Sequence, residues 1–173
     1  MIITIDEVKN FSGIFPDTDD IVTSCAMSAE SIVTDYLRYN PIKQTYTHKA
    51  TGNGSNALVL NACPISGAVT IDGITYADYD YSNNIIKIDG LKFDYLKRYV
   101  VSYTAGYDAV NLPVIIKHTI TQIAALLLTE SGGHIGITSV SDNNSGSRTF
   151  INYSNFSKYL KNLAKYRAYQ SLI

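Results

Sequence analysis

The chain has 173 residues, of which 46% are hydrophobic and 17% are charged, and its formal net charge is −1. This composition excludes an intrinsically disordered chain and fits one domain of ordinary size around a buried core. The near-zero net charge excludes the global basic field that many nucleic-acid-binding proteins carry.

Two helices are expected before residue 41. Thr4 and Glu7 have the spacing of a capping box, which predicts a short helix that ends near Phe11. The acids of 17–20 then suit the start of a second helix, because they complement the helix dipole. The apolar stripe of this helix has spacings of three and four residues, and it consists of Val22, Cys25, Ala26, Ala29, Ile32, Val33, Tyr36 and Leu37.

Strands are expected between residues 42 and 106. The dipeptides Asp72-Gly73 and Asn83-Asn84 each separate two short strand-like runs, which predicts two β-hairpins. We expect one small antiparallel unit of about five or six strands, drawn from the segments 45–47, 57–60, 68–71, 74–76, 79–81, 85–88 and 98–104.

A third helix is expected over 112–130. This segment is apolar on most sides, with Pro113 in its first turn and Gly132-Gly133 after its end, so it should lie at the centre of a helical bundle. The following residues, 131–147, are rich in Gly, Ser and Asn and are expected to form a long loop.

The last part of the chain is basic. Residues 148–153 are expected as a strand or an extended arm, and a final helix should run from Asn155 to about Tyr169. Residues 151–173 hold four bases and no acid, whereas 1–40 hold seven acids and two bases. These opposite charges could pair within one subunit or between neighbouring subunits, or they could be solvated helix faces.

The order of these elements predicts an α+β fold. About four helices should form a helical core, with a small antiparallel β insertion between the second and third helices. We expect one domain over 1–173, in which 1–41 and 107–173 build the helical core and 42–106 form the β insertion.

The sequence offers little catalytic chemistry. No Gly-x-Ser-x-Gly, His-x-x-His, Cys-x-x-Cys or His-Glu-x-x-His spacing occurs, and the two cysteines cannot make a structural zinc site alone. We therefore expect no enzyme, no metal and no cofactor. A small hydrolase-type enzyme that uses His48, His118 or His134 stays open as an alternative. No stretch approaches the roughly 18 apolar residues of a membrane span, so we expect no signal peptide and no membrane partner.

Several segments, taken in order, resemble one protein family. The most specific is Val100-Val101-Ser102-Tyr103-Thr104-Ala105-Gly106-Tyr107, followed by Leu112-Pro113 and the apolar helix. The opening Ile3–Phe11, the segment Val69–Gly73 and the closing Gly136–Ser141 fit the same order. Together they resemble the head-tail connector proteins of tailed bacteriophages and prophages, which are also called adaptor or head-completion proteins.

This resemblance implies a structural role in the virion neck. Such proteins form a homo-oligomeric ring, usually of twelve subunits, below the portal protein of the DNA-filled head. The ring extends the channel through which double-stranded DNA passes without sequence specificity, and it receives a stopper or tail-completion protein. Assembly takes place in the host cytoplasm. Another neck or tail component, such as a stopper or tail-completion protein itself, is the alternative within the same class.

The resemblance also suggests which surfaces make contacts. We expect the C-terminal helix and tail, 155–173, to dock on the portal, with the candidate residues Tyr159, Lys161, Lys165, Tyr166, Arg167 and Tyr169. We expect the loop 131–147 and the residue after it to contact neighbours or the next ring, with the candidate residues Gly133, His134, Ile135, Ser141, Asn143 and Arg148.

Overall fold

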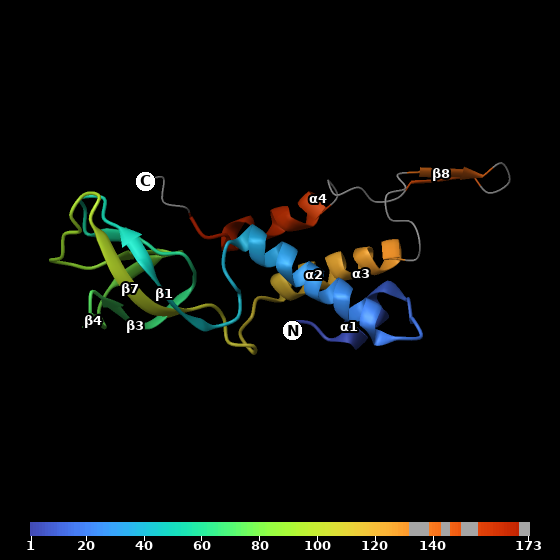
Figure 1. The fold of residues 1–173 in the computed structure, drawn as a ribbon, viewed down its shortest axis with the longest axis horizontal. Coiled ribbons are helices and arrows are strands. Elements are labelled where there is room, and N and C mark those ends of the chain that lie inside the picture. Colours follow the sequence, from blue (N-terminus) through green and yellow to red (C-terminus); the bar gives the residue numbers. More distant parts are fainter. Residues whose placement is uncertain (132–138, 143–145, 150–155, 170–173) are drawn as a thin grey trace. The chain divides into compact units, whose positions relative to one another are not determined.

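The structure, a computed structural model, describes residues 1–131, 139–142, 146–149 and 156–169, with the backbone alone for 139–142 and 146–149. The chain divides into two compact units (Figure 1). The helical unit comprises Met1–Tyr36 and Pro113–Lys165, and the β unit comprises Leu37–Leu112 and Tyr166–Ile173. The fold class is α+β, with strands between the second and third helices, as the sequence predicted.

In the helical unit, α1 (Ile5–Ser12) begins at the predicted capping box. The Glu7 amide donates to the Thr4 hydroxyl over 3.2 Å, and the Thr4 amide donates to the Glu7 carboxylate over 2.8 Å. Both α1 and α4 (Phe156–Leu160) contact α3 (Val114–Ser131). The buried side chains of this unit come from all its helices. They include Val8, Val22, Ala26, Ala29 and Val33 from α1 and α2, Ile116, Ile120, Ile123, Ala124 and Leu128 from α3, Phe156 from α4, and Leu163 from the 3₁₀ helix that follows α4.

The second helix, α2 (Asp19–Leu37), follows the predicted apolar stripe. Val22, Ala26 and Val33 are fully buried, as the spacing of three and four residues requires for one face. The acids Asp19 and Asp20 lie in its first turn, where they complement the positive end of the helix dipole.

The C-terminal helix is shorter than predicted. Instead of a helix to Tyr169, the five residues of α4 lead into a 3₁₀ helix over Lys161–Tyr166, and an extended segment follows. In the extended segment, the Ala168 amide donates to the Leu37 carbonyl over 3.0 Å. Tertiary hydrogen bonds therefore replace the helical bonds that the sequence pattern favoured.

The β unit is larger than the small insertion that the sequence predicted. It holds two antiparallel sheets, with strand orders β1-β7-β3-β4 and β2-β6-β5. Leu58 in β2 and Ile86 in β6 are fully buried, so the second sheet covers apolar surface that a single sheet of this size would leave exposed. The strands are β1 (Gln44–Thr51), β2 (Ala57–Val59), β3 (Ile65–Ile71), β4 (Ile74–Tyr76), β5 (Asp80–Ser82), β6 (Ile85–Lys87) and β7 (Arg98–Ala105).

The two predicted hairpins are confirmed. Asp72-Gly73 joins β3 to β4 with Ile71 paired to Ile74, and Asn83-Asn84 joins β5 to β6 with Ser82 paired to Ile85. Asp72 and Gly73 both have positive φ angles, of 47° and 85°, which is the turn geometry that fits the right-handed twist of a hairpin.

The four-stranded sheet has one buried and one hydroxyl-rich face. Val101 and Tyr103 of β7 are buried. On the other face, one row of residues crosses all four strands through Thr47, Ser102, Thr70 and Thr75. Hydroxyl pairs link Thr47 to Ser102 over 3.0 Å and Thr70 to Thr75 over 3.3 Å.

The segment predicted as a loop over 131–147 contains an additional hairpin. β8 (Ser139–Asp142) pairs antiparallel with β9 (Gly146–Thr149), in a register that places Ser139 opposite Thr149. Loop composition alone gave no sign of this hairpin, because Ser, Asn and Gly are usual in turns and rare in strands. The strand or arm predicted over 148–153 overlaps β9, and its residues from 150 onward lie outside the described ranges.

Candidate functional site

The C-terminal candidates lie in both units. Tyr159, Lys161 and Lys165 belong to the helical unit, where Leu163 between them is fully buried and the two lysines are exposed. Tyr166, Arg167 and Tyr169 belong to the β unit. The sequence grouped these six residues into one docking helix, and the structure instead places them on a short helix, a 3₁₀ turn and an extended segment.

The side chain of Asn84 holds the extended segment. Its amide nitrogen donates to the Tyr169 carbonyl over 2.9 Å, and its oxygen accepts from the Tyr169 amide over 2.8 Å. The same amide nitrogen also donates to the Leu60 carbonyl. Asn84 is fully buried, and such a side chain must have its polar atoms satisfied, which these three bonds achieve.

Neighbouring groups bind the rest of this segment. The Asn83 amide donates to the Arg167 carbonyl over 2.9 Å, and the Arg38 guanidinium donates to the Ala168 carbonyl over 3.5 Å. The Cys63 thiol lies 3.7 Å from the Tyr166 carbonyl oxygen. We call the side chains of Asn83 and Asn84 the Asn84 clamp. Their bonds to this segment go to main-chain groups of Arg167 and Tyr169.

The clamp determines which side chains of the segment face solvent. Ala168 is buried, whereas Arg167 is exposed and the side chain of Tyr169 is 60% exposed. This alternation is typical of an extended chain with one face against the protein. The clamp therefore presents Arg167 and Tyr169 outward from a fixed backbone.

The loop candidates are described only in part. Gly133, His134, Ile135 and Asn143 lie outside the described residues. Ser141 lies in β8 opposite Ser147, and Arg148 lies in β9 opposite Val140.

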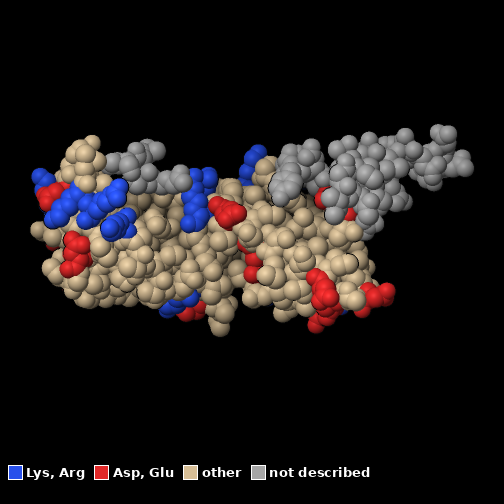
Figure 2. Space-filling view, in the orientation of Figure 1, with Lys and Arg blue, Asp and Glu red and all other residues tan. Residues whose placement is uncertain are grey.

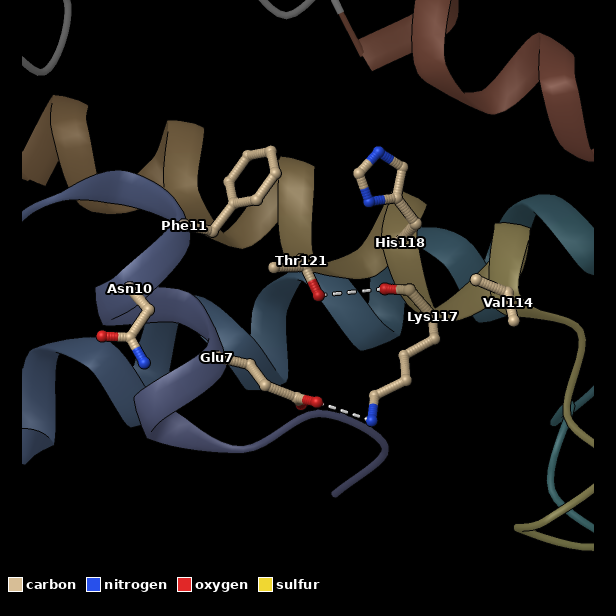
Figure 3. A pocket seen from close by; sticks show the side chains of 7 residues that line it. All are labelled: Glu7, Asn10, Phe11, Val114, Lys117, His118 and Thr121. Atoms are coloured by element: carbon tan, nitrogen blue, oxygen red, sulfur yellow. Dashed lines mark hydrogen bonds and ion pairs between the residues drawn. The ribbon is translucent and has the colours of Figure 1, made fainter.

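A groove between α1 and α3 is a second candidate site (Figure 3). It has a volume of about 470 Å³. Phe11 meets His118 edge to face at 5.7 Å, and Val114 is 81% exposed. Glu7 forms an ion pair with Lys117 over 2.6 Å, and this lysine lowers the pKa of the Glu7 carboxyl. With its charges paired and its rings exposed, this groove has the character of a protein contact surface.

Exposed apolar side chains occur in both units. Such residues are frequent where a protein contacts another chain, and Figure 2 shows that most of the visible face carries neither acidic nor basic side chains. The large ones in the helical unit are Met1, Phe11, Phe15, Ile21, Met27 and Val114, and those in the β unit are Ile74, Tyr81, Tyr95, Leu96, Val100, Val110 and Tyr169.

The candidate histidines lie in different parts of the chain. His48 lies in β1, His118 lies in α3, and His134 falls outside the described ranges. The ring nitrogens of His48 have no hydrogen-bond partner among the described residues. Across the same residues, no cluster of three or more His, Cys, Asp or Glu side chains could hold a metal ion. No helix in the described part is long and apolar enough to cross a membrane.

Tyrosines and a cysteine form the buried polar interior of the β unit. Burial raises the pKa of Tyr103 to about 12, that of Tyr107 to about 12 and that of Cys63 to about 11. The Tyr103 hydroxyl accepts from the amides of Asn61 and Ala62, both over 3.0 Å. Because these groups stay protonated near neutral pH, they serve as hydrogen-bonding core residues, and the thiol is not poised as a nucleophile.

His48 makes the stability of the β unit dependent on pH. Burial lowers its pKa, and its ring packs edge to face on Tyr103 at 5.5 Å. The unfolded chain therefore takes up a proton at a pH where the folded chain does not, so stability is lost as pH falls below about 6.5.

We expect the free energy of unfolding, measured by urea titration at pH 7 and pH 5, to fall less in His48→Phe than in the original chain. The carboxylates titrate equally in both proteins, so the difference reports His48. An equal fall in both proteins would contradict this assignment.

Solved structures of other proteins share the fold of this chain. The chain has the fold of proteins from a particle neck: it matches the neck of an empty gene transfer agent particle with C6 symmetry at a TM-score of 0.59 and 14% identity, covering 99% of this chain and 92% of that chain. It also matches the neck of the native particle with C12 symmetry at a TM-score of 0.59 and 15% identity, covering 97% and 90% of the two chains. No curated protein matches the sequence.

The sequence profile of the head completion protein family matches residues 1–130. The chain belongs to the head completion protein family, as the resemblance suggested. The match spans the helices α1, α2 and nearly all of α3, together with both sheets of the β unit. The C-terminal segment and the β8–β9 hairpin lie beyond it.

Proposed function

We propose that this chain is a structural subunit of a virion neck, in which copies form a ring that joins the portal vertex to the stopper or tail and extends the DNA channel. The observation that carries this proposal is the family match over 1–130. The likeness to structures of gene transfer agent necks computed with C12 and C6 symmetry supports a homo-oligomeric ring, for which the family resemblance implies twelve subunits. In this role the chain is not an enzyme, and double-stranded DNA passes through the ring without sequence-specific contacts.

The C-terminal part is our candidate for contact with the portal. Lys161 and Lys165 are exposed, and they flank the buried Leu163 in sequence. Arg167, which the clamp leaves exposed, follows two residues later. An acidic partner surface would complement these bases. We assign contact with neighbouring subunits or the next ring to 131–148, because the outer edges of the two-stranded β8–β9 sheet pair with no other strand of the described residues.

The proposal is tested by affinity purification from infected or induced cells, followed by mass spectrometry and electron microscopy of particles labelled on this chain. Recovery of a portal protein, with label at the head-tail junction, is the expected result. Label at the tail side of a stopper would instead identify another neck component. Recovery of a metabolic enzyme without virion proteins would overturn the proposal.

Charge reversal tests the portal assignment more sharply than truncation. Removing 155–173 would also remove the buried Phe156 and Leu163 from the helical unit, so lost binding would not identify a contact. Lys161→Glu with Lys165→Glu should weaken portal binding about tenfold, which corresponds to about 1.4 kcal/mol. Binding is measured by interferometry at two salt concentrations.

The matched control is Lys92→Glu, which alters an exposed lysine of the β unit. It should bind the portal as the original chain does. If the double variant also binds unchanged, the basic residues of the C-terminal part do not face the portal.

A further inference from the structure

We propose that the Asn84 clamp is a binding site for an extended polypeptide main chain, and that in the assembled protein it binds residues 166–169 of a second copy of this chain. Within one copy, the same segment fills the site. The exchange of this segment would link each subunit to its neighbour. This inference concerns the contact between copies, and only its place in a ring rests on the proposed function.

The chemistry of the clamp defines its ligand class. Asn84 donates to the carbonyl and accepts from the amide of the same residue, Tyr169. This pair of bonds copies the bonding of a strand to its neighbour in an antiparallel sheet. Asn83 adds a bond to the Arg167 carbonyl. Any extended chain with a small side chain at the position of the buried Ala168 satisfies these contacts.

The clamp is part of the folded core of the β unit and is held in place by other residues of that core. Asn84 is fully buried, and its amide is fixed from behind by a bond to the Leu60 carbonyl. Its own main-chain carbonyl accepts from the Leu60 amide over 2.8 Å. A buried amide held on one side by the fold and open on the other to a main chain is a preorganised peptide receptor.

The path of the chain makes the segment exchangeable. The chain passes between the units at residues 36–37, 112–113 and 165–166. The first two passages bracket all seven strands of the β unit, whereas the third delivers only the short segment. A 3₁₀ helix, Lys161–Tyr166, precedes the segment, and such short turns often serve as hinges.

An exchange of this kind needs little additional energy. Every copy carries the same segment and the same clamp, so the bonds formed in the exchanged state equal those lost. The balance between the two states then depends on the protein concentration and on the hinge. A segment on a short tether has an effective concentration of about 1 mM at the clamp of its own copy. A ring supplies neighbours at comparable local concentration. Because the segment of one copy enters the clamp of the next, the contact is heterologous and can close a ring.

The first test uses sedimentation of the full chain after unfolding and refolding at about 1 mM. We expect dimers or larger species that separate slowly on dilution. Tyr169→Pro removes the amide that donates to Asn84, and Asn84→Ala removes the acceptor, so neither variant can form the full contact within one copy. A refolded mixture of the two variants can form it between copies, and this mixture should associate more strongly than either variant alone.

The second test uses the unaltered sequence. Isotope-labelled and unlabelled chains are refolded together, and filtered NMR spectra detect contacts between the Asn84 amide protons of one copy and Tyr169 of the other. Such inter-chain contacts are expected. A chain that stays monomeric at 1 mM, or a mixture of Asn84→Ala and Tyr169→Pro that associates no more than either variant alone, would overturn the exchange. The purification described above is independent of this result, so failure here leaves the neck assignment standing.

Discussion

Replacing Asn84 with alanine should lower the free energy of unfolding by about 3 kcal/mol. The substitution leaves the Leu60 carbonyl and both main-chain groups of Tyr169 without their partner. Each buried polar group that loses its partner costs about 1–3 kcal/mol, and part of this is recovered because Tyr169 can turn toward water. Urea unfolding followed by circular dichroism measures the change.

The matched control is Asn83→Gly. It removes one hydrogen bond of the same type, from the side-chain amide to the Arg167 carbonyl, but at the exposed edge of the clamp. Glycine also accepts the φ of 58° at this position. We expect a loss below about 1 kcal/mol. Equal losses in the two variants would mean that burial of Asn84 does not determine the strength of the clamp.

Replacing Gly106 with alanine should destabilise the chain by about 3–4 kcal/mol. Its φ is 105°, which side chains rarely adopt, and an added Cβ would lie 2.8 Å from the carbonyl carbon and oxygen of Ile42 and from the amide nitrogen of Lys43. These are backbone atoms held by the bridge between Ile42 and Tyr107, so they cannot give way cheaply. Thermal and urea unfolding measure the loss.

Gly73→Ala separates the backbone strain from the overlap. Gly73 has a φ of 85°, and nothing lies within 4 Å of its added Cβ. This variant should lose only about 1 kcal/mol, which is the strain of the left-handed conformation. If Gly106→Ala loses no more than Gly73→Ala, the close approach of the two backbones is not what requires glycine at 106.

Much of the fold follows from local patterns in the sequence. The capping box at Thr4 and Glu7, the apolar stripe of α2 and the two-residue turns Asp72-Gly73 and Asn83-Asn84 all appear where predicted. These signals are reliable because the residues that make each one lie within a few positions of each other. The order of these segments along the chain was also sufficient to suggest the family.

Two features depended on long-range contacts instead. The split of the strands into two sheets depends on pairing β2 with β6 and β1 with β7, across many residues. The C-terminal helix ends early because main-chain groups of residues 166–169 find partners in the β unit. In each case non-local hydrogen bonds outweighed the local preference.

By itself, the sequence determined the first three helices, the two hairpin turns and the absence of a recognisable catalytic motif, and it suggested the family. Only the tertiary structure decided the role of Asn84, which the sequence placed in an ordinary turn. Its burial and its bonds to Leu60 and Tyr169 join residues that are far apart in the chain. A turn residue becomes a peptide clamp when the fold closes around it, because burial obliges every polar atom to find a partner.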